Sequence, residues 1–137
     1  MQSTNLKASV IYIIFCILQN LLNISVLRYH RYLQYVDLSW NQLTDVSSLG
    51  HVPYLVYLDV SHNKLTTLLN FTAPWFLSHV NYSFNYINHI ADLSEFWAMK
   101  FLDLSHNNIM RIEGLNTLRW VIAWNNVLSK FKATGFI

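Results

Sequence analysis

Charged residues, glycine, proline and cysteine are all scarce in this chain of 137 residues. Only 12% of the residues are Asp, Glu, Lys or Arg, and there are three glycines, two prolines and a single cysteine, Cys16. One cysteine excludes a disulfide framework and a cysteine-rich zinc site. The low glycine and proline content excludes collagen-like and linker-like chains. The net charge of +2 comes from scattered residues, so there is no basic footprint for nucleic acid.

Apolar side chains, in contrast, are abundant. Hydrophobic residues make up 53% of the chain and aromatic residues 15%. This composition excludes intrinsic disorder as the main state, because disordered chains lack apolar residues and carry charge. A chain of this length forms one domain and can bury about two-thirds of its unfolded surface. It must therefore bury itself well, join a larger assembly or contact a membrane.

One short pattern occurs four times at a constant interval. LQYVDLSWNQL begins at Leu33 and returns as LVYLDVSHNKL at Leu55, LSHVNYSFNYI at Leu77 and MKFLDLSHNNI at Met99. The shared frame, LxxLxLxxNxL, is similar to the leucine-rich repeat, whose stacked units bury a core that no single unit can bury. The frame extends less regularly to both ends. We predict one domain over residues 1–137, with a degenerate or capping repeat at 1–32, four regular repeats at 33–117 and a degenerate repeat at 118–137.

The frame predicts the fold class α/β: a leucine-rich-repeat solenoid, a right-handed β-α superhelix of about six repeats. The last two apolar residues of LxxLxL are two apart, so they share one face of a short strand, and the strands stack in parallel. In the second half of each repeat the apolar residues are three apart, as in Leu43, Val46, Leu49 and Val52. This spacing fits a short 3₁₀-like return and not a long α-helix. Such short returns resemble one class of leucine-rich repeats, a resemblance that implies an intracellular scaffold.

An asparagine occupies the ninth position of every regular copy. Its side chain has both a donor and an acceptor, so it can pair with backbone groups of its own and of neighbouring loops. We predict that these residues form a structural ladder: Asn41, Asn63, Asn85 and Asn107.

The outward strand positions are the candidate partner-binding site, on the concave face of the solenoid. Exposed aromatic side chains are typical of binding hot spots. The third position of successive repeats forms an aromatic column, with two rings from the eighth position beside it: Tyr35, Tyr57, His79, Phe101 and Trp120, with Trp40 and Phe84. The fifth position forms an acidic column, Asp37, Asp59 and Asp103, which we predict meets basic groups on a protein partner. At the seventh position, serines form a further column that is predicted to point outward. Asp and Ser are also ordinary residues at these positions of the repeat, so the alternative that the two columns have no specific binding role stays open.

No pattern in the sequence indicates catalysis. Phosphate-binding loops, the dinucleotide fingerprint, the nucleophile elbow and the HExxH zinc motif are all missing. His62 and His106 fall two strands apart, roughly 10 Å, which is too far to share one zinc ion. We expect no enzyme activity, no cofactor, no metal, no nucleic acid and no small-molecule substrate.

The N-terminus leaves a second reading open. Residues 8–18 form an apolar run, ASVIYIIFCIL, which fits either the repeat frame or the apolar core of a targeting segment. It is too short for a transmembrane helix, which needs about 20 residues. If it is a repeat, Ile13, Phe15, Ile17 and Leu18 point outward. Three glycosylation sequons begin at Asn23, Asn70 and Asn81, a number close to chance for this composition. The alternative function is a secreted or membrane-attached recognition module.

Two stretches carry a more particular resemblance. PYLVYLDVSHNKLTTLLNFTAPWFL, from Pro53, and INHIADLSEFWAMKFLDLSHNNIMRIEGL, from Ile87, resemble the repeat region of the leucine-rich repeat and guanylate kinase domain-containing family. The ciliary family of leucine-rich repeat-containing protein 23 is similar. This resemblance implies a cytoplasmic scaffold at the cytoskeleton, the basal body or the cilium, with a cytoskeletal or ciliary partner. Kinase activity does not carry over, because the chain has no phosphate-binding loop.

Overall fold

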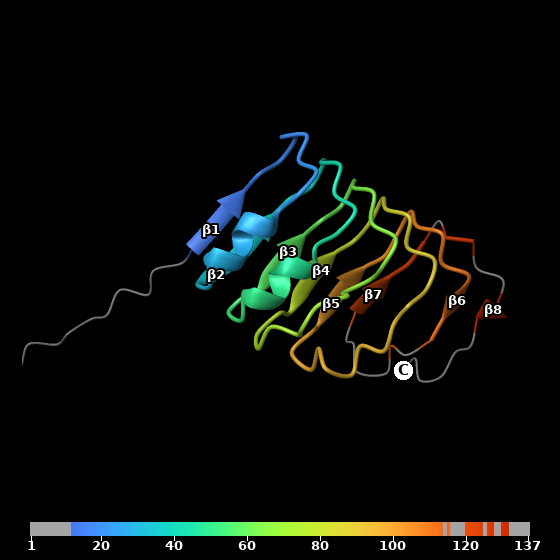
Figure 1. Ribbon diagram of the computed structural model, residues 1–137. Helices are drawn as coiled ribbons and strands as arrows, with labels where there is room; N and C mark the ends of the chain where they lie inside the picture. Colours follow the sequence, from blue (N-terminus) through green and yellow to red (C-terminus); the bar gives the residue numbers. More distant parts are fainter. Residues whose placement is uncertain (1–11, 114, 116–119, 125, 128–129, 132–137) are drawn as a thin grey trace, which may run out of the picture.

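The computed structural model describes residues 12–113, 115, 120–124, 126–127 and 130–131. Six short strands in this part of the chain form one parallel sheet in chain order, as Figure 1 shows. The strands are β1 (Tyr12–Phe15), β2 (Leu33–Asp37), β3 (Tyr57–Asp59), β4 (His79–Asn81), β5 (Phe101–Asp103) and β7 (Trp120–Ile122). A parallel sheet whose strands follow one another in chain order, one strand per repeat, confirms the predicted solenoid.

The strand register follows the repeat frame. Tyr35 pairs with Tyr57, which pairs with His79, so each step of the sheet advances by one full repeat. The last step, from Phe101 to Trp120, is shorter than the others. β1 extends the sheet at the other end, with Ile14 opposite Val36. Its outward residues Ile13 and Phe15 are exposed, as the repeat reading of this segment requires.

The core lies between the strands and the returns of the solenoid (Figure 1). The inward strand positions Val36, Leu58, Val80 and Leu102 are at most 1% exposed, and the residues two positions after each of them are fully buried. One of these is Tyr82, the largest fully buried side chain, whose hydroxyl accepts a hydrogen bond from the backbone N–H of Leu69 at 3.3 Å. Burial raises the pKa of the Tyr82 phenol above its ordinary value. The hydroxyl is neutral and paired, so a polar atom is accommodated in an apolar core.

The returns match the prediction only in part. The 3₁₀ helices η1 (Ser25–Tyr29) and η2 (Ser47–His51) occupy the first two, whereas the described returns after β3 and β4 contain turns and no helix. After β5 the return is extended, and β6 (Arg111–Ile112) pairs in parallel with β8 (Lys130–Phe131).

Short polar side chains make hydrogen-bonded turns at the start of several returns. Asn23 and Asp45 accept hydrogen bonds from the backbone N–H of Ser25 and Ser47, the first residues of the two 3₁₀ helices. In the return after β4, Asp92 accepts a hydrogen bond from the backbone N–H of Ser94 at 2.9 Å in the same way, although no helix follows. The apolar spacing is therefore shared by the returns, and the side-chain turn alone does not determine which of them is helical.

Candidate partner-binding site on the strand face

The structure brings the predicted aromatic column together on the outward side of the strands. Tyr35, Tyr57, His79, Phe101 and Trp120 are consecutive register partners across five strands. The rings of Tyr35 and Tyr57 stack with centroids 6.1 Å apart, and those of His79 and Phe101 do the same at 6.1 Å. Trp120 is 66% exposed, while Tyr57 and Phe101 are half-buried between their neighbours. The column is thus continuous and open to a partner.

The acidic column lies beside the aromatic one and has a structural role of its own. One carboxylate oxygen of Asp37, Asp59 and Asp103 accepts a hydrogen bond from the backbone N–H of the serine two residues later, at 2.8–2.9 Å. Asn81 does the same in β4 and also donates its amide to Asp59 at 3.0 Å. These side chains cap the turn that ends each strand, so their presence in the repeat needs no partner to explain it.

The second carboxylate oxygens can still accept hydrogen bonds from a cation, because a carboxylate oxygen accepts more than one hydrogen bond. Asp37 and Asp59 are direct register partners with like charges, and no described Lys or Arg side chain forms an ion pair with them. Burial, followed by the charges of Asp59 and Asp37, raises the pKa of the neighbouring Tyr57. The outward side of the strands, which we call the strand face, therefore has a negative electrostatic potential beside its aromatic rings.

The serine column does not belong to this face. Ser39, Ser61, Ser83 and Ser105 are between 3% and 7% exposed, so the prediction that they point outward is wrong. Each strand ends at its fifth position, and the chain then turns, which carries the seventh position into the interior. Strand alternation does not apply beyond the end of a strand.

A second set of rings, which we call the ring ladder, runs along the edge where the strands end. Trp40 stacks on His62 at 3.6 Å, His62 on Phe84 at 4.1 Å and Phe84 on His106 at 3.9 Å, with interplanar angles of 10–13°. Trp124 closes the row edge-on against His106 at 4.1 Å. Trp40, His62, Phe84 and His106 all occupy the eighth position of their repeats, but the predicted binding site contained only Trp40 and Phe84. Trp124 is at the seventh position of the last repeat, and its contact with His106 was not predicted.

The ring ladder has a backbone cause. Its first four members have φ between 52° and 57°, in the left-handed region that side chains rarely adopt. A left-handed residue in the same place in every repeat points every ring the same way, and neighbouring rings then meet. The stacking is worth about 0.5–1.5 kcal/mol per pair, which offsets part of the backbone cost of about 1–2 kcal/mol per residue.

The asparagine ladder lies directly behind these rings. The amide group of Asn85 donates to the carbonyl oxygens of Val60, Tyr82 and Ser83 at 2.9, 3.1 and 3.2 Å. Its oxygen accepts from the backbone N–H of Leu65 at 2.9 Å. Two of these four partners, Val60 and Leu65, belong to the preceding repeat. The other predicted members, Asn41, Asn63 and Asn107, bridge to the preceding repeat in the same way.

A fifth asparagine extends the ladder. Asn126 donates to the carbonyl oxygens of Leu104 and Ala123 at 2.9 and 3.0 Å and accepts from the N–H of Ile109 at 2.9 Å. This residue fits the frame of the last repeat, but the shortened step before it hides it from a search at a fixed interval. The shorter repeat is therefore in register with the others.

The described part of this face contains no candidate metal site. No group of three or more His, Cys, Asp or Glu side chains within them is placed to hold a metal ion. His62 and His106 lie on either side of the Phe84 ring, so they do not converge on a common point.

Comparison with known proteins identifies the architecture. Residues 29–47 and 54–74 match two family models described as leucine-rich repeats. The fold is that of a leucine-rich-repeat solenoid. No curated protein sequence matches it.

Two solved structures are similar in fold. One is internalin C2 from Listeria monocytogenes, with a TM-score of 0.68 and 24% identity over 80% of this chain and 50% of that chain. Another is the functional domain of InlJ from the same species, with a TM-score of 0.55 and 19% identity over 81% of this chain and 29% of that one. The solenoid thus spans about half the length of internalin C2. The InlJ domain includes a cysteine ladder, which this chain, with one cysteine, cannot form.

Replacing Asn85 by Ala tests the asparagine ladder. The change leaves the N–H of Leu65 and the carbonyl groups of Val60 and Tyr82 without this partner. We expect the free energy of unfolding in urea to fall by about 2 kcal/mol or more. Asn108→Ala, an exposed position of the same residue type, is the matched control and should change stability by less than about 0.5 kcal/mol. Equal stability of the two variants would contradict the ladder.

The histidines of the ring ladder predict a pH dependence of stability. Burial lowers the pKa of His62, with the charge of Asp59 opposing and His106 reinforcing the shift. A lowered pKa means that the unfolded chain binds the proton first, so stability is full above the ordinary histidine pKa of about 6.5 and falls as pH drops below it. His62→Phe keeps a stacked ring but removes the titrating group. Its free energy of unfolding, measured in urea, should therefore decrease less than that of the unmodified chain between about pH 7.5 and pH 5. His89→Phe, outside the ladder, is the control, and an unchanged fall in the His62 variant would refute the assignment.

Proposed function

We propose that this solenoid is a non-catalytic protein-interaction scaffold that binds a partner protein on its strand face. The observation that carries the proposal is the continuous aromatic column from Tyr35 to Trp120, beside the ring ladder. Aromatic residues that are already held in place by their neighbours lose little side-chain entropy on binding, which is why they dominate interface hot spots. Leucine-rich repeats suggest the same class of function.

The partner segment that fits this face has both apolar and basic side chains. Its apolar groups would pack between the rings of the column, and its Lys or Arg side chains would meet the outer oxygens of Asp37, Asp59 and Asp103. A cation between a carboxylate and the face of an aromatic ring is stabilised by a charge-assisted hydrogen bond and by a cation–π interaction. Tyr57 and Phe101 occupy the middle of the column and are the strongest candidates for anchors.

The proposed setting of the scaffold is the cytoplasm, at the cytoskeleton or the base of a cilium, and it rests on the resemblance of the repeat sequences alone. The alternative is a secreted or membrane-attached module. Within the described residues, no helix is both long and apolar enough to span a bilayer. Two of the three sequon asparagines, Asn23 and Asn70, are exposed, whereas Asn81 is half-buried in β4.

Site-specific photocrosslinking in cells tests the strand face. A benzoylphenylalanine placed at Tyr35 should give a discrete covalent adduct with a partner protein. The double variant Tyr57→Ala/Phe101→Ala in the same chain should reduce that adduct about tenfold or more, because it removes two half-buried anchors. Tyr86→Ala/Trp97→Ala removes two exposed rings away from the column and is the matched control. An adduct that survives the first pair, with circular dichroism unchanged, would sink the proposal.

Glycosidase treatment of the full chain expressed in mammalian cells distinguishes the two settings. A cytoplasmic chain keeps its electrophoretic mobility after treatment, because N-glycosylation takes place only in the secretory lumen. A mobility shift that disappears in Asn70→Gln would overturn the cytoplasmic setting in favour of the secreted or membrane-attached one.

A further inference from the structure

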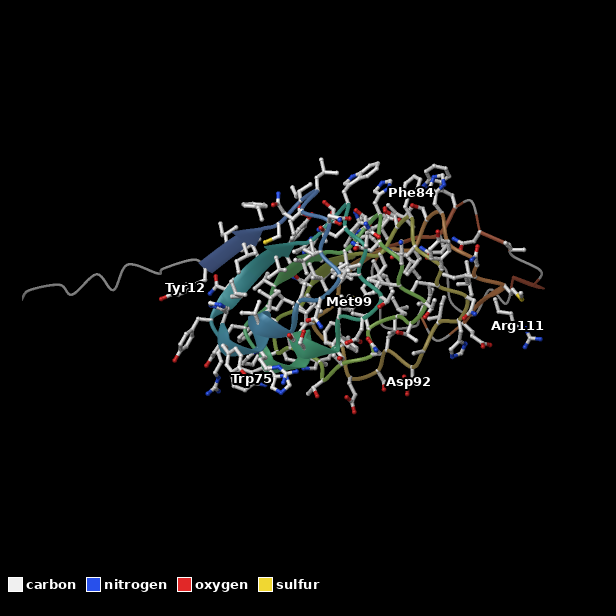
Figure 2. All side chains as sticks on the ribbon, turned by 45° about the horizontal axis from the view of Figure 1, so that its top comes forward. Tyr12, Trp75, Phe84, Asp92, Met99 and Arg111 are labelled. Carbon is white, nitrogen blue, oxygen red and sulfur yellow. The ribbon has the colours of Figure 1, made fainter. Side chains whose placement is uncertain are left out.

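A small pocket opens on the opposite edge of the solenoid, where the chain enters the strands. It lies between the start of β1, the end of η1 and the start of β2, and its volume is about 200 Å³. We call it the tyrosine pocket; its lining residues are Tyr12, Tyr29, His30, Arg31, Tyr32 and Leu33. Figure 2 shows Tyr12 and Trp75 on one side of the molecule and Phe84, a member of the ring ladder, on the other. The tyrosine pocket is therefore separate from the ring ladder.

The charge of the tyrosine pocket is positive and unbalanced. Arg31 lines it together with His30, and Arg28 lies in the helix that leads into it. None of the seven acidic residues of the chain lines the pocket, and no described carboxylate forms an ion pair with Arg31. Three tyrosines add phenolic hydroxyl groups, which are hydrogen-bond donors at neutral pH. The pocket therefore offers hydrogen-bond donors and no negatively charged acceptor, a combination that is suited to bind an oxyanion.

The walls of the pocket are aromatic rings that neighbouring rings hold in place. Tyr32 lies 6.1 Å from Tyr12 and 5.8 Å from Tyr54, with its ring nearly parallel to that of Tyr54 at 15°. Tyr54 in turn meets the edge of Trp75 at 5.4 Å. Tyr29, at the end of η1, is 78% exposed, so its ring is accessible to a ligand in the pocket. An aromatic ring bound in the pocket would pack against these tyrosine rings, whereas an anion without a ring would not.

The size of the pocket limits the ligand further. Sites for drug-sized molecules usually measure about 300–1,000 Å³, so a volume of about 200 Å³ suits a group of side-chain size. We propose that the tyrosine pocket binds an aromatic ring carrying an oxyanion, namely the side chain of a phosphotyrosine on a partner protein. The phosphoryl group pairs with Arg31 and His30, and the phenyl ring packs against Tyr29 and Tyr32. The site is independent of the strand-face function.

Calorimetric titration of the full chain with N-acetyl-O-phosphotyrosine amide tests this assignment. The expected result is one saturable site, with affinity at least about tenfold above that of N-acetyltyrosine amide, which lacks the anion. Inorganic phosphate, which lacks the ring, should also bind at least about tenfold more weakly than the phosphotyrosine probe. Arg31→Gln should weaken the phosphotyrosine probe by about tenfold or more. Arg111→Gln, an exposed arginine in β6, is the matched control and should leave the affinity unchanged.

Several outcomes would overturn the proposal. Equal affinity of Arg31→Gln and the control would place the anion elsewhere, and equal affinity of inorganic phosphate would remove the role of the rings. Binding of phosphatidylserine vesicles that depends on Arg31, with no response to the phosphotyrosine probe, would assign the pocket to a membrane surface.

Unchanged circular dichroism in Arg31→Gln excludes misfolding as the cause of lost binding. Because Tyr57→Ala/Phe101→Ala leaves this pocket intact, failure here and failure of the strand-face proposal are distinguishable.

Discussion

The hydrogen bonds of one asparagine per repeat are the constraint on which the rest of this structure depends. Each side chain pairs with the turn that ends its own strand and with two backbone groups of the preceding repeat. These backbone groups are buried, so a slip of the frame would leave several of them unpaired at about 1–3 kcal/mol each. The ladder therefore fixes the register between repeats, including the short step to the last strand. All the columns of the strand face follow from that register.

The same ladder determines where the aromatic rings lie. The residue before each of the four regular asparagines takes a left-handed conformation at the corner between strand and return, with φ near 55°. Glycine is the usual residue for such a corner, and here the corners carry Trp, His and Phe instead. Their rings stack because the asparagines hold successive corners in line. The row of rings along this edge is thus a consequence of backbone geometry repeated at constant register.

The repeat frame made the sheet, its register and its core predictable from the sequence. The repeat period places Tyr57 beside Tyr35 and buries Leu58, and the structure has both. The returns were less predictable, because the same apolar spacing occurs in returns that form 3₁₀ helices, such as Ser47–His51, and in the return after β4, which forms only turns. The burial of the serines and the stacking of the two histidines were not predicted for a related reason: strand alternation ends with the strand, and the left-handed corner that follows has no signature in hydrophobicity. Most of the tyrosine pocket, from Tyr29 to Tyr32, comes from residues just before the first regular copy, where the repeat frame specifies no residue type.

The two edges of the sheet differ in charge, and this difference bears on how a partner would lie. The strand face carries the carboxylates of Asp37, Asp59 and Asp103, while Arg28 and Arg31 lie where the chain enters β2. Each strand is only three to five residues long in the regular repeats, so the negative and positive regions are separated by about 10–17 Å along the strand direction. At physiological salt this separation is at or beyond the screening length of about 8 Å, so each region acts on a ligand largely by itself. A partner that has both a basic segment and an anionic ring would be bound in one direction across the strands, because reversing it would place like charges together. In the binding mode we propose, charge at the two edges would specify the orientation of the partner, and the aromatic column between them would supply the contact area.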